Sequence, residues 1–510
     1  MQPRELLIKH THKFNSVFNG FTKDPVLQQY KVFKKLINKA VDTEFGKKFQ
    51  FDEILTANFD IALFRKLVPI YNYESIYEEW WKRVKRGDVN TCWPGKIKYF
   101  ALSSGTSKGA SKFIPVSKQM LKTIRKTSLK QIVAISEMGL PNKMFGGQVL
   151  MIGGSTKLEE KNGRFFGDMS GISMAHAMPD WFNKNYYRPG FDISELTTWK
   201  LRVDAIVKQA ADWNITVICG MPNWVYYLLE KIVEHYNVKS IHDIWPNFKL
   251  YIHGGVYFQP FKSDFEKLLK HPIKFAETYM TSEGFFGFST ADSNGNIRLV
   301  LNGNVFYEFI PYINENFDDL GMLKNKVKTY TINEIQANTN YALLITNNSG
   351  AWRYLIGDVV KFIDVKKAVI QITGRIGKSL NVCGEHVTNT NLLEAFHHMA
   401  NALEIEPGEF TVFSNYQNGK GVHHWFIAGN KTLTQLAIAN KLDKKLAQLN
   451  TDYEVARSAN LSKPVVHIIS KRSMQQWLTK RGKEGNQNKM PVILNESAIA
   501  DWITFTGVSL

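Results

Sequence analysis

The sequence predicts an α/β protein with a large layered N-terminal domain and a smaller α+β C-terminal domain. Short apolar runs that lead into glycines alternate with longer amphipathic runs in the first half of the chain, which is typical of α/β layers. Further along, β-rich segments follow one another without a helical pattern between them. The 510 residues also exceed what one hydrophobic core usually supports. We therefore expect an N-terminal domain at 1–378 and a mobile C-terminal domain at 379–510.

Four apolar runs of the N-terminal part predict strands of the layered sheet. They are 148–152, 215–219, 249–252 and 273–279. The amphipathic run 223–236 predicts a helix after the second of these strands, and a further helix is expected after Ser117. The β-rich segments 304–312 and 341–348 predict mixed sheets and a β-barrel-like part beyond the layers.

The pattern restarts after residue 378. The expected elements are a helix at 389–402, a strand at 411–415, a helix at 431–448 and a strand at 465–469. Helices and strands of this length, without an internal repeat, favour a small α+β domain.

Composition narrows the class of protein. A hydrophobic fraction of 44% and a charged fraction of 22% are typical of a globular protein. No apolar run has the length of a membrane-spanning helix, and residues 1–10 lack the apolar stretch of a secretory signal, so we expect a cytoplasmic protein without a membrane partner. Three cysteines are too few and too scattered for a disulfide framework or a C-x-x-C metal site.

The formal net charge of +18 raises the question of a nucleic-acid partner. The most concentrated basic stripe lies on the expected helix after Ser117. It consists of Lys118, Lys122, Arg125, Lys126 and Lys130. A solvated helix face is the favoured interpretation, because no nucleic-acid-binding signature accompanies the stripe. We expect no nucleic-acid partner, and the charge can attract small anions such as ATP.

The most informative motif is S-S-G-T-S-K-G-A-S-K-F-I-P at 103–115, directly after the apolar segment 98–102. Glycines let backbone N–H groups approach an anion, hydroxyls add donors and lysines add charge, so the segment is either a phosphate-binding loop or an ordinary polar loop. It is not a Walker A motif. The sequence at 376–379 resembles the end of one, but Ile372 stands where the first glycine is required.

Three further segments occur in a specific order downstream. They are Y-M-T-S-E-G at 279–284, Y-L-I-G-D at 354–358 and T-G-R-I-G-K at 373–378. With the loop at 103–115 they resemble the adenylate-forming (acyl-activating) superfamily, and more closely the auxin-responsive, or Gretchen Hagen, family of acyl-acid amido synthetases. Further similarity at 220–224, 252–256 and 487–491 extends the resemblance over nearly the whole chain.

The resemblance implies an ATP- and Mg²⁺-dependent ligase that converts a small carboxylic acid to an acyl-AMP and transfers the acyl group to an amine, such as an amino acid. Adenylation is needed because oxide is a poor leaving group and the carboxylate charge repels nucleophiles. Two alternatives stay open, an acyl-CoA ligase with a thiol acceptor and a nucleotide-binding regulator without turnover. The sequence leaves the acid, the amine and the oligomeric state undetermined.

The resemblance also implies roles for individual residues. The nucleotide-binding residues are Ser103, Ser104, Gly105, Thr106, Ser107, Gly254, Gly255, Tyr279, Thr281, Asp358, Arg375 and Lys378. The loop hydroxyls suit the β- and γ-phosphates, and Asp358 suits the ribose hydroxyls. Glu283 is the expected ligand of Mg²⁺, and Glu283 and Lys489 are the expected catalytic residues. The acyl pocket is expected to draw on 169–179 and Trp224.

Each of these residues also has a structural alternative. Glu283 can begin a helix that Thr281 or Ser282 caps, and Asp358 can form a turn between strands. Arg375 and Lys378 can belong to a solvated turn between domains. Lys489 lies in a glycine-rich segment where lysines are usually exposed, and Val492 replaces the arginine that family members carry nearby. No zinc-hydrolase or serine-esterase motif is present.

Overall fold

The computed structural model describes most of the chain. The described residues are 24–103, 112–196, 198–255, 258–318, 321–324, 326–377, 379–405, 409–417, 419–429, 434–480, 490–494 and 496–509. They fall into two compact units that divide after Ile376, with the short segment 259–264 grouped with the second unit. The mobility that we expect for the C-terminal domain stays a prediction.

The first unit is organised around an eleven-stranded mixed sheet with the strand order β12-β13-β14-β15-β11-β10-β9-β8-β7-β3-β6. Its parallel strands are β3 (Gln148–Met151), β6 (Tyr187–Arg188), β7 (Ile215–Gly220), β8 (Leu250–His253) and β9 (Lys274–Thr281). Its antiparallel strands are β10 (Gly284–Ser289), β11 (Ile297–Leu299), β12 (Val305–Pro311), β13 (Asn340–Asn347), β14 (Tyr354–Asp364) and β15 (Val369–Arg375). Strand β9 is the junction, because it pairs in parallel with β8 and antiparallel with β10.

A smaller sheet carries the two ends of the S-S-G-T-S loop. Its strands are β1 (Tyr99–Ser103), β2 (Lys112–Val116), β4 (Glu159–Lys161) and β5 (Arg164–Gly167). Ser103 and Lys112 are directly paired in the antiparallel β1–β2 ladder. The ladder therefore fixes Ser103 and Lys112, the two residues that flank segment 104–111. That segment lies outside the described residues.

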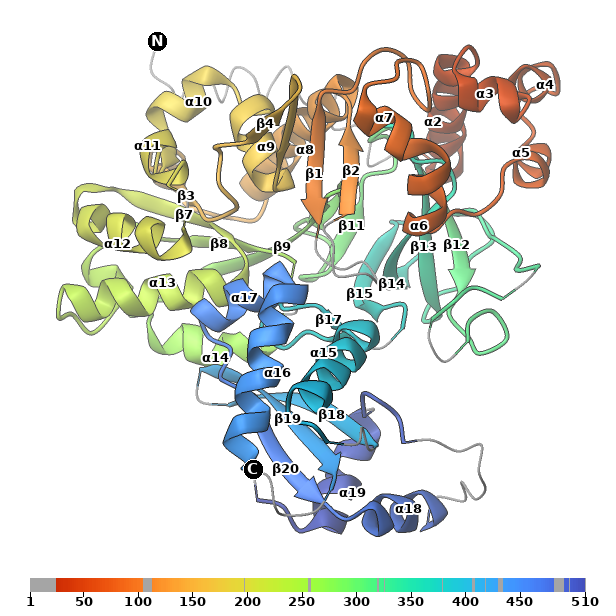
Figure 1. The fold of residues 1–510 in the computed structure, drawn as a ribbon. Coiled ribbons are helices and arrows are strands. Elements are labelled where there is room, and N and C mark those ends of the chain that lie inside the picture. Colours follow the sequence, from red (N-terminus) through yellow and green to blue (C-terminus); the bar gives the residue numbers. More distant parts are fainter. Residues whose placement is uncertain are drawn as a thin grey trace. The chain divides into compact units, whose positions relative to one another are not determined.

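Helices cover the sheets of the first unit (Figure 1). The longer ones are α2 (Pro25–Ala40), α8 (Lys118–Ser136), α9 (Met169–His176), α12 (Trp199–Gln209), α13 (Pro222–His235) and α14 (Gln259–Lys267). The shorter helical segments are α3 (Glu44–Lys48), α4 (Phe51–Thr56), α5 (Ile61–Leu67), α6 (Tyr73–Ile76), η1 (Tyr77–Trp81), α7 (Lys82–Arg86), η2 (Asn142–Gly146), α10 (Asp180–Asn185), α11 (Phe191–Ser194), η3 (Ala210–Asp212) and η4 (Ile241–Asp243). Helix α8 begins where the Ser117 hydroxyl accepts the Met120 N–H at 2.9 Å, which satisfies one of the free N–H groups of its first turn.

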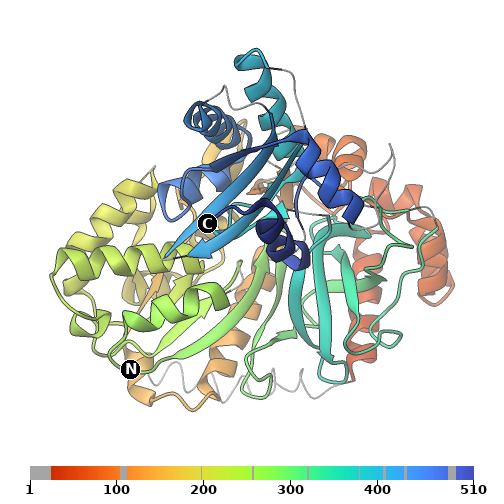
Figure 2. The same ribbon diagram turned by 90° about the horizontal axis from the view of Figure 1, so that it is seen from below.

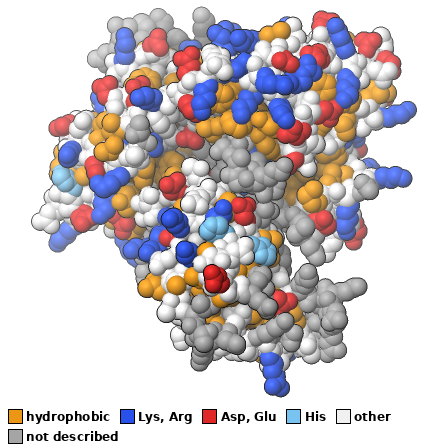
Figure 3. Space-filling view, in the orientation of Figure 1, with side chains coloured by type: hydrophobic (Ala, Val, Ile, Leu, Met, Phe, Trp, Pro, Cys, Tyr) orange, Lys and Arg blue, Asp and Glu red, His pale blue; other side chains and the backbone are white. Residues whose placement is uncertain are grey.

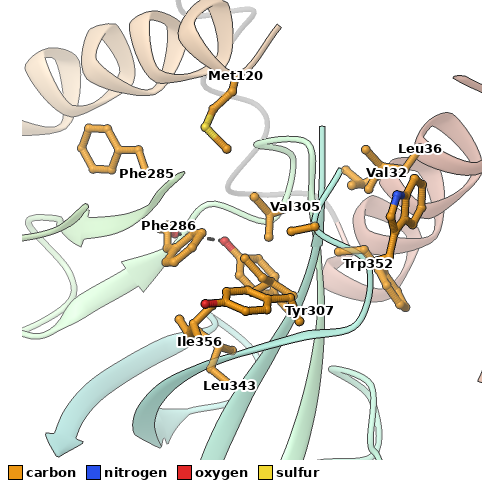
Figure 4. Close-up of a cluster of buried hydrophobic side chains, with 14 of the residues drawn as sticks. Val32, Leu36, Met120, Phe285, Phe286, Val305, Tyr307, Leu343, Trp352 and Ile356 are labelled. Atoms are coloured by element: carbon orange, nitrogen blue, oxygen red, sulfur yellow. Dashed lines mark hydrogen bonds between the residues drawn. The ribbon is translucent and has the colours of Figure 1, made fainter. Parts of the chain in front are cut away.

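The antiparallel half of the sheet packs against α2 and α8 through an aromatic-rich core (Figure 4). Val32 and Leu36 come from α2, Met120 comes from α8, and Phe286 and Tyr307 come from β10 and β12. These residues are distant in sequence and all fully or nearly fully buried. The core therefore fixes the strands that carry the β9–β10 turn and the Gly-Asp segment of β14.

One buried ion pair reinforces the same region. The Glu308 carboxylate accepts from Arg353 Nε at 3.0 Å and from Arg65 Nε at 3.1 Å, and the side chains of Glu308 and Arg353 are 1% and 6% exposed. The Thr329 hydroxyl donates a further hydrogen bond to Glu308 at 2.7 Å. Arg353 also donates to the backbone carbonyl of Val68 at 2.7 Å. The cluster thus joins α5 and the segment after it to the antiparallel strands.

The second unit has a three-stranded sheet with helices on both faces (Figure 2). Its elements are β16 (Ser379–Leu380), β17 (Val387–Thr388), α15 (Asn389–Ala402), β18 (Phe410–Gln417), β19 (Lys420–Ala428), α16 (Gln435–Leu449), α17 (Thr451–Ser458), β20 (Val465–Ile469), α18 (Lys471–Lys480) and α19 (Glu496–Thr506). Trp425 of β19 belongs to the core shared with α15 and α16, and its neighbour Phe426 to the core shared with α18 and α19. Because successive side chains of a strand point to opposite faces of the sheet, β19 contributes to the hydrophobic cores on both faces.

The predicted fold class is confirmed, since the structure has a large mixed α/β part and a smaller α+β part. Strand β20 and helix α15 have the predicted bounds, while β19 and the two last helices were not anticipated from the sequence. Four of the five basic residues on α8 are exposed, and Lys130 is partly buried with its ammonium donating to Asn302. No helix among the described residues is long and apolar enough to cross a membrane.

Candidate active site

The turn between β9 and β10 presents Glu283 at the junction of the parallel and antiparallel strands. Thr281 and Gly284 pair directly, so Ser282 and Glu283 form a two-residue hairpin turn. The Glu283 N–H donates to the Thr281 hydroxyl at 3.1 Å, and the Asn347 amide donates to the Glu283 carbonyl at 2.9 Å. The helix-cap alternative for Glu283 is therefore wrong, because the chain continues as a strand.

Asp358 lies inside strand β14 and is held from two sides. The Tyr279 hydroxyl donates to Asp358 Oδ2 at 2.7 Å, and Arg375 forms an ion pair with Asp358, with 3.1 Å between Nε and Oδ1. Arg375 is the residue that pairs with Asp358 across the β14–β15 ladder. Gly357 has a φ of 96°, which only glycine adopts without strain, and it accompanies the irregular pairing of β14 just before Asp358.

The turn alternative for Asp358 is therefore wrong. The structure also brings together three residues that the sequence places far apart, Tyr279, Asp358 and Arg375. A carboxylate has about four lone-pair sites, so two stay available on Asp358 after Tyr279 and Arg375 are satisfied. That capacity matches the pair of hydroxyls on a ribose.

Lys112 adds a second positive charge to this site. Its ammonium lies 5.3 Å from the centre of the Tyr73 ring. Burial lowers the pKa of Lys112, the charge of Arg375 lowers it further, and the carboxylates of Glu283 and Asp358 oppose the shift. The four charged side chains are therefore close enough to act on one another.

Glu283 is the most buried acid of this group, with 8% of its surface exposed. Burial raises the pKa of its carboxyl, and the charge of Lys112 works against that rise. Among the described residues no group of three or more His, Cys, Asp or Glu side chains is arranged to hold a metal ion. Glu283 thus offers a single carboxylate, which fits Mg²⁺ that keeps phosphate oxygens and waters as its other ligands.

Lys112 was not among the expected nucleotide-binding residues. The available signal was its place in the 103–115 motif, where it matches the lysine of the family loop. The sequence alone did not show that this lysine is the first residue of β2 and lies near Glu283 and Asp358. Pairing of Ser103 with Lys112 also brings the start of the loop to the same position.

The two glycines after β8 are required by the backbone. A Cβ atom on Gly254 would lie 2.3 Å from the carbonyl oxygen of Thr278 on β9, so any side chain would push the strands apart. Gly255 has a φ of 82°, in the region that favours glycine. Both therefore lie at the carboxyl end of β8, beside the strand that carries Tyr279. Their contact with the nucleotide stays a prediction.

The remaining expected residues are not described by the structure. They are Ser104, Gly105, Thr106, Ser107, Lys378 and Lys489. The predicted acyl pocket is described by the structure: residues 169–179 form α9 and the segment after it, and Trp224 lies in the first turn of α13. These roles stay predictions.

Replacement of Asp358 by alanine is expected to weaken binding of MgATP about tenfold or more, because a charge-assisted hydrogen bond is worth about 1.5–3 kcal/mol. The same change leaves the buried Tyr279 hydroxyl unpaired, so a lower unfolding temperature is expected as well. Calorimetric titration with MgATP measures the first effect. Asp358→Asn keeps the size and one acceptor oxygen, so it separates the effect on binding from the effect on stability. If Asp358→Ala bound MgATP with unchanged affinity, Asp358 would not belong to the nucleotide site.

Glu277 and His253 are two titratable residues that the sequence did not indicate. They are register partners, with Glu277 in the middle of β9 and His253 at the end of β8. Burial raises the pKa of Glu277 to about 7 and lowers the pKa of His253 to about 4. The Nδ1 atom of His253 is buried and has no hydrogen-bond partner within the described part of the chain. Both side chains are therefore neutral in the folded protein over a pH range in which the unfolded chain is charged.

One part of the pH dependence of stability should follow the titration of Glu277. Because the folded state keeps a proton on Glu277 that the unfolded chain releases, Glu277 contributes a part of the free energy of unfolding that falls as the pH rises from about 4.5 to about 7, whereas His253 contributes a part that rises from about 4 to about 6.5. Glu277→Gln should lose this part of the pH dependence, as measured by the unfolding temperature across that range. Glu53→Gln on the exposed face of α4 is the control. Parallel curves for wild type and Glu277→Gln would contradict the buried proton.

Three family models match successive parts of the chain. Residues 15–203 match the GH3 family N-terminal domain, residues 298–375 the central domain and residues 390–498 the C-terminal domain. The chain is 23% identical over 524 residues to jasmonoyl–L-amino acid synthetase JAR6 of Nicotiana attenuata, covering 87% of this chain and 86% of the relative.

Two solved structures share the fold. The GH3.15 acyl acid amido synthetase superimposes with a TM-score of 0.58 at 14% identity, covering 96% of this chain and 95% of that protein. A 2-hydroxyisobutyryl-CoA ligase in complex with its acyl-AMP and CoA gives a TM-score of 0.59 at 11% identity, with 94% and 92% covered. The prediction of an amido synthetase, which is a ligase, agrees with the name of the jasmonoyl relative. The three domain matches together span most of the chain, which therefore belongs to the GH3 family.

Proposed function

We propose that this protein activates a small carboxylic acid with ATP, forming an acyl-AMP and pyrophosphate, and then transfers the acyl group to the amine of an amino acid. The observation that carries the proposal is the cluster at the β9 junction, where Asp358 is held by Tyr279 and Arg375 while Glu283 and Lys112 lie near it. Such a set of charges suits a nucleotide with its metal ion. The family of the chain supports the same reaction.

The residues of this cluster have different roles in adenylation. Asp358 has two lone pairs free for ribose hydroxyls, and Tyr279 and Arg375 keep its carboxylate in place. Lys112 supplies positive charge that acts on Glu283. When bound, Mg²⁺ neutralises phosphate charge and leaves the α-phosphate open to attack. The acid's carboxylate oxygen then bonds to the α-phosphorus, the bond to the bridging oxygen breaks, and pyrophosphate leaves with that electron pair.

Amide formation follows without a further nucleotide. The neutral amine attacks the acyl carbon, AMP leaves with the electron pair of the broken C–O bond, and the amine loses a proton. A site that excludes water protects the mixed anhydride from hydrolysis. Pyrophosphate release on addition of an acid tests the first step, and the mass of the product formed with amino acids tests the second.

Two other outcomes of that experiment are informative. A thioester with CoA, and no amide, would favour the acyl-CoA ligase. Binding of MgATP without pyrophosphate release for any acid would favour a nucleotide-binding regulator. A pooled screen of carboxylic acids against amino acids, with AMP formation and product mass as readouts, distinguishes all three.

Millimolar MgATP is expected to raise the unfolding temperature of the protein, because a ligand that binds only the folded state stabilises it by mass action. Differential scanning fluorimetry with and without MgATP measures the shift. Asp358→Ala is the matched control and should show a smaller shift at the same ligand concentration. The absence of any shift in the wild type would contradict nucleotide binding.

A further inference from the structure

Two buried N–H groups on the first turn of α12 have no hydrogen-bond partner among the residues that the structure describes. They are Nε of Arg202 and Nε1 of Trp199, and Trp199 is only 8% exposed. A buried donor without an acceptor is costly and uncommon in a folded protein. Both donors belong to the same turn, and the Arg202 guanidinium lies 5.6 Å from the centre of a Trp199 ring. They are therefore close enough together to serve one ligand group.

This turn lies at the carboxyl ends of the parallel strands. Arg202 donates from its terminal nitrogen to the carbonyl of Gly153, two residues after β3, at 2.7 Å. The ring of Trp199 packs against Trp224, with 5.2 Å between their centres, and Trp224 lies in the helix that follows β7. Ligands of α/β sheets bind at such strand ends. Trp224 also belongs to the predicted acyl pocket.

The hydrogen bond to Gly153 holds the Arg202 guanidinium, and the Asp168 carboxylate partly offsets its charge. Gly154 packs so closely on Asp168 that a Cβ atom there would overlap the carboxylate. Burial lowers the pKa of Arg202, and the negative charge of Asp168 opposes that shift. With an acid already near it, Arg202 is better suited to a neutral acceptor oxygen than to a second carboxylate.

Strand order gives the distance of this turn from the reacting centre. Strands β8 and β7 lie between β9, which ends at Thr281, and β3. Three strand spacings of about 4.8 Å amount to roughly 14 Å. A group bound at α12 is thus far from a carboxylate activated beside Glu283, at the tail of the acid rather than at its head.

We propose that Arg202 and Trp199 form a subsite that binds an oxygen atom in the tail of the acyl acid. The preferred substrates are then acids of medium chain length that carry a hydroxyl or carbonyl group far from the carboxylate. This inference rests on the proposed function and goes beyond it by naming the substrate class. A purely apolar tail would leave both buried N–H groups unpaired in the complex.

The test compares a medium-chain ω-hydroxy acid with the unsubstituted acid of the same length. Pyrophosphate release gives kcat/KM for both, and the wild type should favour the hydroxy acid by about tenfold or more. Arg202→Met should bring the ratio close to one, mainly by raising KM for the hydroxy acid, while the unsubstituted acid is unaffected. Trp199→Phe, which keeps an aromatic ring and removes the N–H, should lower the ratio as well and serves if Arg202→Met folds poorly.

Lys200→Met is the matched control. Lys200 is in the same turn of α12, but its side chain is 84% exposed and pairs with Asp204, so this variant removes a positive charge without altering the interior. It should keep the wild-type ratio.

Three results would overturn the subsite and leave the proposed reaction standing. The wild type could show equal kcat/KM for the two acids, or activity confined to acids without a tail oxygen. The ratio could also stay unchanged in both Arg202→Met and Trp199→Phe. If no acid supported pyrophosphate release, both the subsite and the proposed reaction would be overturned.

Discussion

Replacement of Lys489 by alanine is expected to slow pyrophosphate release by about tenfold to a thousandfold, the scale of losing one preorganised donor. A lysine ammonium stabilises the charge that develops between the α- and β-phosphates during adenylation. After pyrophosphate has left, that charge is gone, so amide formation from supplied acyl-AMP should keep its rate. Measuring pyrophosphate release and amide formation separately tests whether Lys489 acts only in adenylation.

Lys483→Ala is the control for this prediction, because Lys483 belongs to the same glycine-rich segment and has no counterpart in the expected site. It should leave both half-reactions unchanged. Equal slowing of both half-reactions by Lys489→Ala, or of neither, would show that Lys489 does not act in adenylation alone. Val492, which stands where family members have an arginine, would then be the first position to test.

Replacement of Glu308 by glutamine is expected to destabilise the first unit by about 3–5 kcal/mol, the usual cost of removing one partner from a buried ion pair. Arg353 would stay buried with a positive charge and without the carboxylate that faces it, and Arg65 would lose the same partner. A substantial fall of the unfolding temperature, measured by circular dichroism, is the expected result.

Glu334→Gln provides the comparison. Glu334 also pairs with Arg65, at 3.3 Å, but its side chain is 35% exposed, so its loss should cost no more than about 1 kcal/mol. If the two variants unfolded at the same temperature, burial of the Glu308 pair would not be a major source of stability.

The loop at 103–115 and the order of three later segments were enough to assign the family. Such motifs are readable because phosphate binding needs particular residues at fixed local spacing: glycine for close approach, hydroxyls as donors and lysine for charge. Hydrophobic periodicity likewise predicted α15 and β20 with their correct bounds. These features depend on neighbours within a few residues.

The sequence left short-range alternatives open where a residue type suits several local structures. A serine or threonine before Glu283 suits a helix cap as well as a hairpin, and Gly-Asp suits a turn as well as an irregular strand. The structure decided both, because Glu283 lies in the hairpin turn between β9 and β10, and pairing with β15 keeps Asp358 in the sheet. Those partners come from other parts of the chain.

The sequence by itself determined the family and the fold class, and it predicted the residue types of a nucleotide site. Only the tertiary structure decided that Asp358 lies between Tyr279 and Arg375, that Lys112 and Glu283 act on one another electrostatically, and that two buried donors of α12 have no partner among the described residues. The physical reason is that each of these depends on strand order and burial. A strand pairing joins residues tens or hundreds of positions apart, and whether a polar group is buried depends on elements that no local pattern specifies.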